Sequence, residues 1–391
     1  MAVRQLSKDV FSVGAIDWDR QIFDELIPLP DGTSYNAYLL RGRVKTVLID
    51  AVDPAKQKEL FLNLNELDIS SLDFVVANHA EQDHSGAIPA VLERYPMAEV
   101  ITNPKCKGFL MDLLHIPEEK FIEVHDGEEL DLGGMTLKFI YTPWVHWPET
   151  MSTYLQEEKI LFSCDFFGSH RAASNLYVED ECKVLQDAKR YYAEIMMPFR
   201  QQIKKNLEKL SLLAIDKIAP SHGPVYDRPS LIIDAYRDWV SDSVNKKVVI
   251  AYVSMHGSTQ RIVDVLTSNL IKKGMTVVPV NLSVSDVGQF AMELVDAGAL
   301  VFASPYVLAG MHPAVVYAAY LTNALRPKAK VVASVFSYGW GGRGAEQLRN
   351  MLSSLRAEFF EPVLIRGNML DKDAGLLGDI VDRMGGLLSH V

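Results

Sequence analysis

The second half of the chain alternates apolar runs with helix-length segments, and this rhythm constrains the fold more than any other feature. The runs are KVVIAYVS (247–254), TVVPVNL (276–282), ALVFASP (299–305), KVVASVFS (330–337) and EPVLIRG (361–367). Continuously apolar runs are typical of strands buried on both faces of a parallel sheet. Because a helix-length segment separates each run from the next, the pattern predicts a doubly wound parallel sheet.

The first half has a different rhythm, in which short β-like runs are mixed with turns and helical patterns. Its runs include TSYNAYLL, KTVLID, DFVVAN, AEVITN, MTLKFIYT, TYLQEEKILFSCD and DKIAPSH. Consecutive runs such as MTLKFIY and STYLQEEKILFS resemble hairpins, which predicts mixed rather than parallel sheets. Helices are expected at about 55–66, 86–95, 105–114 and 198–210.

A chain of 391 residues is too long for one typical domain, so we expect two. The polar stretch SDSVNKK (241–247) follows a predicted helix that ends in YRDWV. It predicts domains at 1–245 and 246–391.

Charge and cysteine usage exclude several classes of function. The net charge is −11, and residues 246–391 carry 14 Lys and Arg against 11 Asp and Glu, so the first 245 residues carry about −14. Such an acidic half argues against nucleic-acid binding. No run of about 18 apolar residues suggests a membrane span, and MAVRQLSKDV has no apolar signal core. Three cysteines without a CxxC pair predict a reducing, cytoplasmic location and no disulfide framework.

The stretch NHAEQDHSG (78–86) places two histidines and two carboxylates in six positions. It lies between the run DFVVAN and the predicted helix SGAIPAVLERY, on a strand-to-helix loop. In an extended segment His79, Glu81 and Asp83 would project to the same side, and His84 would lie where the helix begins. The alternative is a helix cap with incidental charges. As a set, however, these residues predict ligands directed at one small volume.

Three further candidate ligands lie just after β-like runs. His146 follows MTLKFIYTPWV, Asp165 ends KILFSCD, and His222 ends DKIAPSH. Open sheets place their sites at the carboxyl ends of strands, so these residues are expected to converge. Four imidazoles and three carboxylates are too many for one tetrahedral ion, but they suit two metals that share Asp165. His79, Glu81 and His146 would then serve one metal, and Asp83, His84 and His222 the other, each ion keeping an open position.

These residues carry a family resemblance. HAEQDH together with His146, Asp165 and His222 resembles the metallo-β-lactamase fold, whose hydrolases carry HxHxDH in the equivalent loop. This chain differs at Glu81, where a carboxylate favours iron over zinc. HxExDH followed by a flavodoxin-like domain resembles the flavodiiron proteins, or A-type flavoproteins. The resemblance spans nearly the whole chain, including AIDWD (15–19), TSYNAYL (33–39), HWPETM (146–151) and CDFFG (164–168). In that family the residue equivalent to His84 does not always bind iron.

Three loops of the second half resemble the flavin-binding loops of flavodoxins. Small hydroxyl residues and a glycine at a helix N-terminus form a cradle for an anion, here expected to be the monophosphate of FMN. A plain helix N-cap is the alternative for the first loop, and a core anchor is the alternative for Trp340. The later loops would flank the isoalloxazine ring, with Trp340 as a stacking surface. The loops are Ser254-Met255-His256-Gly257-Ser258-Thr259, Ser304-Pro305-Tyr306-Val307-Leu308-Ala309-Gly310 and Tyr338-Gly339-Trp340-Gly341-Gly342.

The resemblance implies a fold, a reaction and partners. It implies an N-terminal metallo-β-lactamase-like αββα sandwich with two non-haem irons, followed by a flavodoxin-like domain with FMN. It also implies reduction of dioxygen to water, of nitric oxide to nitrous oxide, or of both. The sequence itself identifies no separate acid or base residue. A rubredoxin or a reduced deazaflavin coenzyme would supply electrons to a head-to-tail homodimer or a dimer of dimers. The competing interpretation is a dinuclear zinc hydrolase with a regulatory flavodoxin-like domain.

Overall fold

The computed structural model describes residues 3–389, which divide into two compact units. The first unit comprises Met1–Tyr191 and Phe199–Val240, and the second comprises Tyr192–Pro198 and Ser241–Val391. The short segment Tyr192–Pro198 therefore groups with the C-terminal unit. The domain limits 1–245 and 246–391 stay a prediction, and each unit is described by itself.

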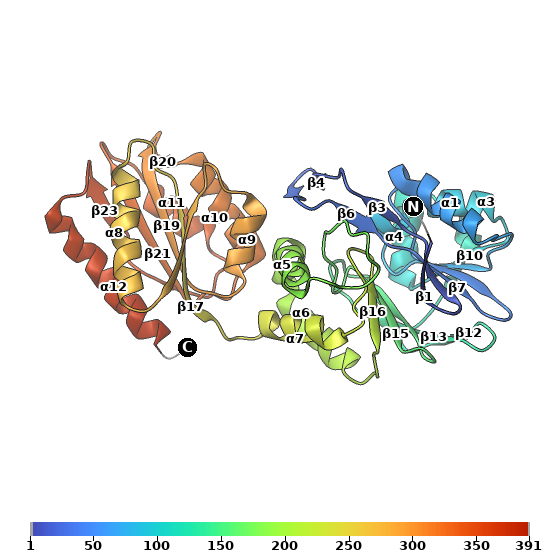
Figure 1. Ribbon diagram of the computed structural model, residues 1–391. Helices are drawn as coiled ribbons and strands as arrows, with labels where there is room; N and C mark the ends of the chain where they lie inside the picture. Colours follow the sequence, from blue (N-terminus) through green and yellow to red (C-terminus); the bar gives the residue numbers. More distant parts are fainter. Residues whose placement is uncertain (1–2, 390–391) are drawn as a thin grey trace. The chain divides into compact units, whose positions relative to one another are not determined.

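The first sheet of the N-terminal unit contains seven strands in the order β1-β2-β7-β8-β9-β10-β11 (Figure 1). Pairing is antiparallel from β1 to β8 and parallel from β8 to β11. The sheet is therefore mixed, as the sequence predicted, although its first two strands were not expected. The strands are β1 (Arg4–Ser7), β2 (Val10–Ser12), β7 (Tyr38–Arg41), β8 (Thr46–Ile49), β9 (Phe74–Val76), β10 (Glu99–Thr102) and β11 (Phe121–Glu123).

The second sheet contains β12 to β16 in sequence order, antiparallel except for the parallel pair β15–β16. Side chains from both sheets form one core, in which Val47 and Ile49 of the first sheet join Leu137, Phe139 and Phe162 of the second. The two sheets therefore pack face to face. The strands are β12 (Glu129–Asp131), β13 (Thr136–Tyr141), β14 (Met151–Leu155), β15 (Ile160–Cys164) and β16 (Lys217–Pro220).

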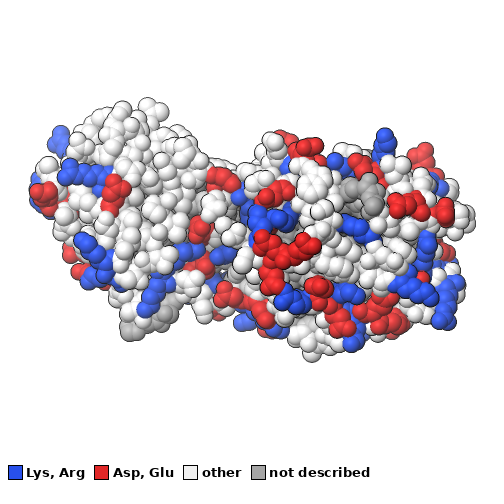
Figure 2. Space-filling model, in the orientation of Figure 1, with Lys and Arg blue, Asp and Glu red and all other residues white. Residues whose placement is uncertain are grey.

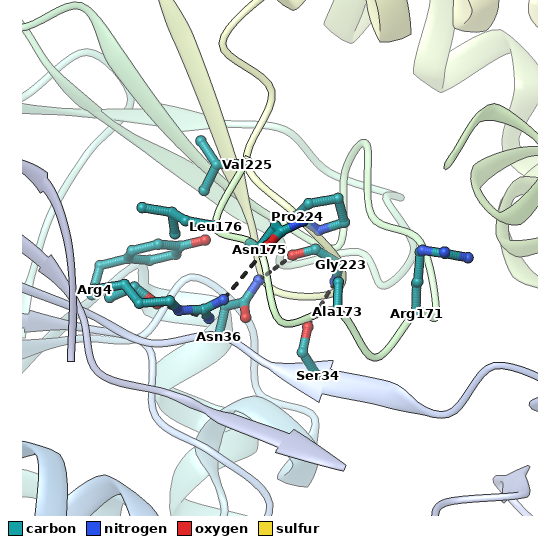
Figure 3. A pocket seen from close by; sticks show the side chains of 12 residues that line it. Arg4, Ser34, Asn36, Arg171, Ala173, Asn175, Leu176, Gly223, Pro224 and Val225 are labelled. Atoms are coloured by element: carbon teal, nitrogen blue, oxygen red, sulfur yellow. Dashed lines mark hydrogen bonds between the residues drawn. The ribbon is translucent and has the colours of Figure 1, made fainter. Parts of the chain in front are cut away.

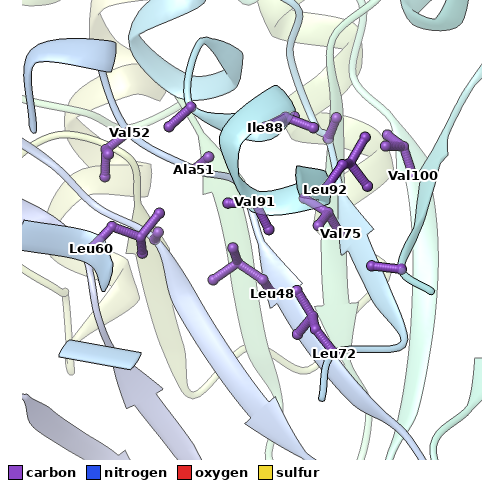
Figure 4. Packing of buried hydrophobic residues seen from close by; sticks show 14 of the residues in the cluster. Leu48, Ala51, Val52, Leu60, Leu72, Val75, Ile88, Val91, Leu92 and Val100 are labelled. Atoms are coloured by element: carbon purple, nitrogen blue, oxygen red, sulfur yellow. The ribbon is translucent and has the colours of Figure 1, made fainter. Parts of the chain in front are cut away.

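A second core fills the space between the first sheet and three helices. Leu48 of β8 packs with Leu60 of α1 (Gln57–Glu66) and Val91 of α3 (Ile88–Arg94), and Leu110 comes from α4 (Pro104–Leu114) (Figure 4). Full burial of each such side chain contributes about 1.5–3 kcal/mol. Helices α5 (Glu181–Tyr191), α6 (Arg200–Leu210) and α7 (Pro229–Val240) pack together, and Tyr236 of α7 packs against Phe166 and Phe167, just after β15. The predicted αββα sandwich is confirmed.

Two short two-stranded pairs complete the N-terminal unit. β3 (Ala15–Asp17) pairs with β6 (Thr33–Tyr35), and β4 (Ile22–Phe23) pairs with β5 (Ile27–Pro28). Phe23 is buried and packs its ring against His170, with centroids 4.8 Å apart, and against His222 at 6.2 Å. The β4–β5 hairpin therefore covers one side of the predicted ligand cluster.

The C-terminal unit has a parallel sheet in the order β18-β17-β19-β21, which β22 and β23 extend beside β21. Only the short β20, which the sequence did not predict, runs antiparallel to β19. This order is that of flavodoxin-like doubly wound folds, so the predicted class is confirmed. The strands are β17 (Asn245–Tyr252), β18 (Thr276–Asn281), β19 (Ala297–Val307), β20 (Gly310–Met311), β21 (Val331–Tyr338), β22 (Glu358–Phe359) and β23 (Val363–Arg366).

Helices cover both faces of this parallel sheet (Figure 1). Ile262 and Leu266 of α8 and Ile380 and Met384 of α12 share a core with Val301 of β19. On the other side, α10 packs with α9 and α11. The helices are α8 (Ser258–Lys272), α9 (Val287–Leu294), α10 (Pro313–Leu325), α11 (Gly344–Met351) and α12 (Ala374–Leu388).

Candidate metal centre

Four of the predicted ligands meet at the carboxyl ends of β9 and β15 and in the loop between β13 and β14. His79 Nε2 lies 3.2 Å from Glu81 Oε2 and 3.4 Å from Asp165 Oδ2. His146 Nε2 lies 2.9 Å from the same Glu81 oxygen and 3.5 Å from the same Asp165 oxygen. The four ligand atoms lie within 4.8 Å of one another. We call His79, Glu81, His146 and Asp165 Oδ2 the first group.

The other predicted ligands form a second group, with Asp165 Oδ1 at its edge. His84 Nε2 lies 3.3 Å from Asp83 Oδ1 and 2.9 Å from Asp165 Oδ1. His222 Nε2 lies 3.1 Å from Asp83 Oδ2 and 3.4 Å from Asp165 Oδ1. We call Asp83, His84, His222 and Asp165 Oδ1 the second group.

The local backbone explains why neighbouring ligands separate into two groups. Glu81 has extended dihedral angles, whereas Asp83 and His84 belong to the short helix α2 (Gln82–Ser85). The expectation that residues 79, 81 and 83 lie in one extended segment was therefore wrong. Because α2 begins directly after Glu81, Asp83 turns away from Glu81 and faces His222 instead.

Asp165 is positioned between the groups, one oxygen facing each. It is fully buried, follows β15 directly, and accepts a hydrogen bond of 2.6 Å on Oδ1 from the hydroxyl of Tyr191. Burial and the charge of Asp165 hold the pKa of Tyr191 well above its usual range, so this phenol stays protonated and donates. A carboxylate with one oxygen toward each group has the geometry of a bridge between two ions.

Several ligand atoms in these groups are buried without a hydrogen-bond partner among the described residues. They are both carboxylate oxygens of Asp83, both ring nitrogens of His84, and Oδ2 of Asp165. Leaving such groups unpaired costs roughly 1–3 kcal/mol each. Their close contacts with one another lack hydrogen-bond geometry, as expected for donors directed at a shared point. The residues present therefore fit two cations with mixed nitrogen and oxygen ligands.

The electrostatics of the site also favour positive charge. Burial alone would raise the pKa of Glu81, but the contacts from His146 and His79 outweigh burial and hold this pKa well below its ordinary value. Burial would lower the pKa of His84, yet Asp165 and Asp83 raise it to about 9. The carboxylates thus draw protons, or metal ions in their place, toward these rings.

Residues that the sequence did not single out orient the ligands. The carboxylate of Glu149 accepts from Nδ1 of His79 at 2.7 Å, and the carbonyl of Ser34 accepts from Nδ1 of His222 at 2.6 Å. These bonds leave Nε2 of both rings free to face the groups. His170 bonds Thr33 and packs 4.5 Å from the ring of His222. Burial, and next His222, keep the pKa of His170 well below its usual range, so this ring is neutral.

A narrow pocket is lined by Gly223, the residue after His222, together with residues from distant segments of the chain (Figure 3). Its wall includes Ser34, Asn36 and Gly223. The amide of Asn36 donates to the carbonyls of Pro220 and Gly223 at 2.8 and 2.7 Å, and Ser34 Oγ accepts from the Gly223 amide at 2.8 Å. β6 and the residue that follows it therefore fix the loop that carries His222, across nearly 190 residues of sequence.

The three predicted flavin segments lie at the carboxyl ends of β17, β19 and β21, which are neighbours in the C-terminal sheet. The first segment follows β17, but residues 304–307 of the second belong to β19 and Tyr338 of the third ends β21, so these two begin in strands rather than in loops. The hydroxyls of Ser258 and Thr259 contact the hydroxyl of Ser337 at the end of β21, at 3.2 and 3.0 Å. The amide of Arg343 donates to the carbonyl of Ala309 at 2.8 Å. The structure therefore brings the three loops together at one edge of the sheet.

The first loop combines a side-chain cap with a glycine turn. Gly257 precedes α8 with φ of 87°, and Ser254 Oγ accepts from the amide of Gln260, in the first turn of the helix, at 3.1 Å. The other amides of such a helix N-terminus can bind an anion such as a phosphate. In the other loops, Trp340 is 68% exposed and Leu308 is 90% exposed, so the alternative of Trp340 as a core anchor is wrong. Figure 2 shows few charged side chains on the visible face around β20, where these loops lie.

No helix among residues 3–389 combines the length and hydropathy needed to cross a membrane. The described cysteines are all free: Cys106 and Cys164 are buried, and Cys182 is exposed.

Comparison with known proteins agrees with this architecture. The model of the ODP family beta lactamases matches residues 33–223. A nitric oxide reductase of Moorella thermoacetica is 36% identical over 360 residues, which cover 90% of each chain. A coenzyme F420H2 oxidase of Methanothermobacter marburgensis is 32% identical and covers 80% of each chain.

Solved structures give the same result over the whole chain. Rubredoxin oxygen:oxidoreductase from Desulfovibrio gigas matches with a TM-score of 0.96 and 29% identity, covering 99% of both chains. The flavodiiron protein from Giardia intestinalis matches with a TM-score of 0.92 and 27% identity, covering 99% of this chain and 97% of that one.

Proposed function

Because this chain belongs to the flavodiiron protein family, we propose that it reduces dioxygen to water, nitric oxide to nitrous oxide, or both. The site would hold two non-haem irons, one in each ligand group, and FMN would occupy the three loops of the C-terminal unit. The observation that carries the proposal is Asp165, whose two carboxylate oxygens each face one complete set of ligands. Glu81 adds a carboxylate to the first group, which favours iron over zinc.

The chemistry of the bound groups accounts for either reaction. Two ferrous ions and a reduced flavin together supply four electrons, which with four protons convert one dioxygen into two waters; two electrons and two protons couple two nitric oxide molecules into nitrous oxide and water. The chain's own residues hold the ligand atoms in place. Glu149 and the Ser34 carbonyl accept from Nδ1 of His79 and His222, Tyr191 donates to Asp165, and Phe23 excludes water from one side.

The proposed reaction needs a donor that supplies electrons to the flavin. Relatives of this chain are named as a coenzyme F420H2 oxidase and a rubredoxin oxygen:oxidoreductase. We therefore propose a rubredoxin or a reduced deazaflavin coenzyme as the donor. The three flavin loops expose Met255, Leu308 and Trp340, which supports a head-to-tail homodimer, or a dimer of dimers, in which a second subunit covers them. Cysteine usage supports a cytoplasmic location.

An anaerobic gas-consumption assay tests this function. The purified protein, reduced through its flavin by an artificial donor, is expected to consume dioxygen or nitric oxide and to contain two irons and one FMN per chain. Sedimentation of the same sample tests assembly, since a fully active monomer would contradict the proposed dimer.

The competing function is hydrolysis at a dinuclear zinc site with the flavodoxin-like unit in a regulatory role. It is not favoured, because the relatives and structural neighbours of this chain are a nitric oxide reductase, a coenzyme F420H2 oxidase and flavodiiron proteins. It shares the fold but not Glu81, which stands where the zinc hydrolases carry histidine. Two zinc ions per chain without iron, together with failure to consume either gas, would favour the hydrolase.

A further inference from the structure

The loop that carries His146 also carries a buried carboxylate, Glu149, that belongs to neither ligand group. Glu149 is 3% exposed and lies three residues after His146, in the sequence HWPET. Its Oε1 accepts from Nδ1 of His79 at 2.7 Å and from the amide of Ala80 at 3.2 Å. Its Oε2 has no hydrogen-bond partner among the described residues. Burying a carboxylate with one unpaired oxygen costs free energy of folding, so the hydrogen bond between Glu149 and His79 is expected to serve a function that offsets this cost.

The surroundings of Glu149 fix both the carboxylate and the ring that it contacts. The side-chain amide of Asn103 donates to the main-chain carbonyl of Glu149 at 2.6 Å. Trp147 presents an edge-to-face contact to the His79 ring, with centroids 5.1 Å apart, and itself packs against Phe109 of α4 at 6.1 Å. One short loop thus holds the imidazole of His79 from two sides.

No histidine of the second group has an equivalent partner among the described residues. Nδ1 of His222 donates to a neutral carbonyl, that of Ser34, and Nδ1 of His84 has no hydrogen-bond partner. A carboxylate that accepts from Nδ1–H makes the opposite nitrogen more electron-rich and a stronger metal ligand, whereas a neutral carbonyl does so less. The two groups have the same number of ligand residues, but only the first contains a histidine whose Nδ1 donates to a carboxylate.

We propose that Glu149 is a positioning residue that makes the first group the tighter of the two metal positions. The inference rests on the proposed two-metal centre and adds an order to it: the ion held by His79, Glu81 and His146 binds more strongly than the ion held by Asp83, His84 and His222. Loss of such an outer partner typically weakens metal binding by about 10–100-fold.

Titration of the full-length, metal-free protein with Co²⁺, followed by its visible absorption, tests this order. Asp83→Ala disables the second group and Glu81→Ala disables the first, so each variant reports on one position. We expect Glu149→Gln to weaken Co²⁺ binding by about 10–100-fold in the Asp83→Ala protein and to leave it unchanged in the Glu81→Ala protein. Glu149→Leu, which also removes the acceptor, should weaken the first position further. Glu93→Gln, on the exposed face of α3, is the matched control and should change neither titration.

The outcomes separate the inference from the metal centre itself. If neither single-position protein binds Co²⁺, the metal centre and the inference both fail. If both bind but Glu149→Gln changes neither titration, or changes both equally, only the inference fails. The Asp83→Ala protein should also bind Co²⁺ more tightly than the Glu81→Ala protein. That comparison leaves residue 149 intact, so equal or reversed affinities overturn the proposal even where Glu149 variants do not fold.

Discussion

Asp165→Asn is the substitution that most directly tests the two-metal centre. It keeps the size of the side chain and one carbonyl oxygen, but it removes the negative charge that both ligand groups share. Asp165 Oδ2 lies 3.4 and 3.5 Å from the two imidazoles of the first group, and Oδ1 lies 2.9 and 3.4 Å from those of the second. Both positions are therefore expected to weaken together.

The magnitude follows from this double contact. Losing an outer partner of a metal ligand costs about 10–100-fold in affinity, and losing an anionic ligand itself costs at least as much. Each ion then loses at least about 1.4–2.8 kcal/mol, or about 3–6 kcal/mol for the pair. Ions that bind only the folded state stabilise it, so the loaded protein should lose a similar amount of its free energy of unfolding. The flavin should remain, because its loops belong to the other unit.

Metal analysis after dialysis against a chelator measures this effect, with the flavin quantified in the same sample. We expect less than one iron per chain, full flavin content, and a lower melting temperature for the iron-loaded protein. Asp112→Asn, exposed on α4, is the matched control and should behave as the parent. Retention of both irons in Asp165→Asn would refute the bridging assignment.

Three further substitutions separate the cofactor sites. Glu81→His gives the ligand pattern of the zinc hydrolases, so protein produced with iron and zinc both present should contain a lower ratio of iron to zinc than the parent protein. An unchanged ratio would contradict the role given to Glu81. Trp340→Ala removes an exposed stacking surface, which should weaken FMN binding by about 2–12-fold, because aromatic stacking contributes about 0.5–1.5 kcal/mol. The free energy of unfolding of the flavin-free protein should change little. Equal FMN affinity of variant and parent in a fluorescence titration would exclude stacking by Trp340. Gly342→Ala would place a methyl group 2.6 Å from Tyr306 Cδ2 and 2.8 Å from the Ala309 carbonyl oxygen, so this loop must shift. FMN affinity should therefore fall while the iron content stays constant. Loss of both FMN binding and iron would indicate general misfolding instead.

The sequence predicted the convergence of the ligands because the end of an apolar run marks the end of a strand. Asp165 and His222 directly follow apolar runs, and the runs do form adjacent parallel strands, β15 and β16. The pattern could not reveal the four-residue helix α2, because four residues span only about one 3.6-residue turn and leave no room for a periodic pattern to repeat. The extended geometry expected for Asp83 failed for that reason.

The residues that orient the ligands without being ligands themselves could not be predicted from the sequence, for a different reason. Glu149 stands three residues after a predicted ligand, yet in sequence a loop carboxylate looks the same whether it is buried or exposed. Tyr191 ends α5, a helix that the sequence did not predict, and only the fold brings it within 2.6 Å of Asp165. Long-range contacts of this kind depend on packing between elements rather than on local spacing.

The unpaired ligand atoms link the folding of this chain to its function. Asp83 and His84 are almost fully buried, and the carboxylate oxygens of Asp83 and the ring nitrogens of His84 lack hydrogen-bond partners among the described residues. Such groups oppose folding by roughly 1–3 kcal/mol each, so the rest of the sandwich core must offset them before any ion binds. Bound cations would satisfy the Asp83 oxygens and Nε2 of His84, which face the second group, and return that part of the free energy. The ligands are thus held in place by β-sheet packing in advance, and metal affinity is determined by how little they need to move.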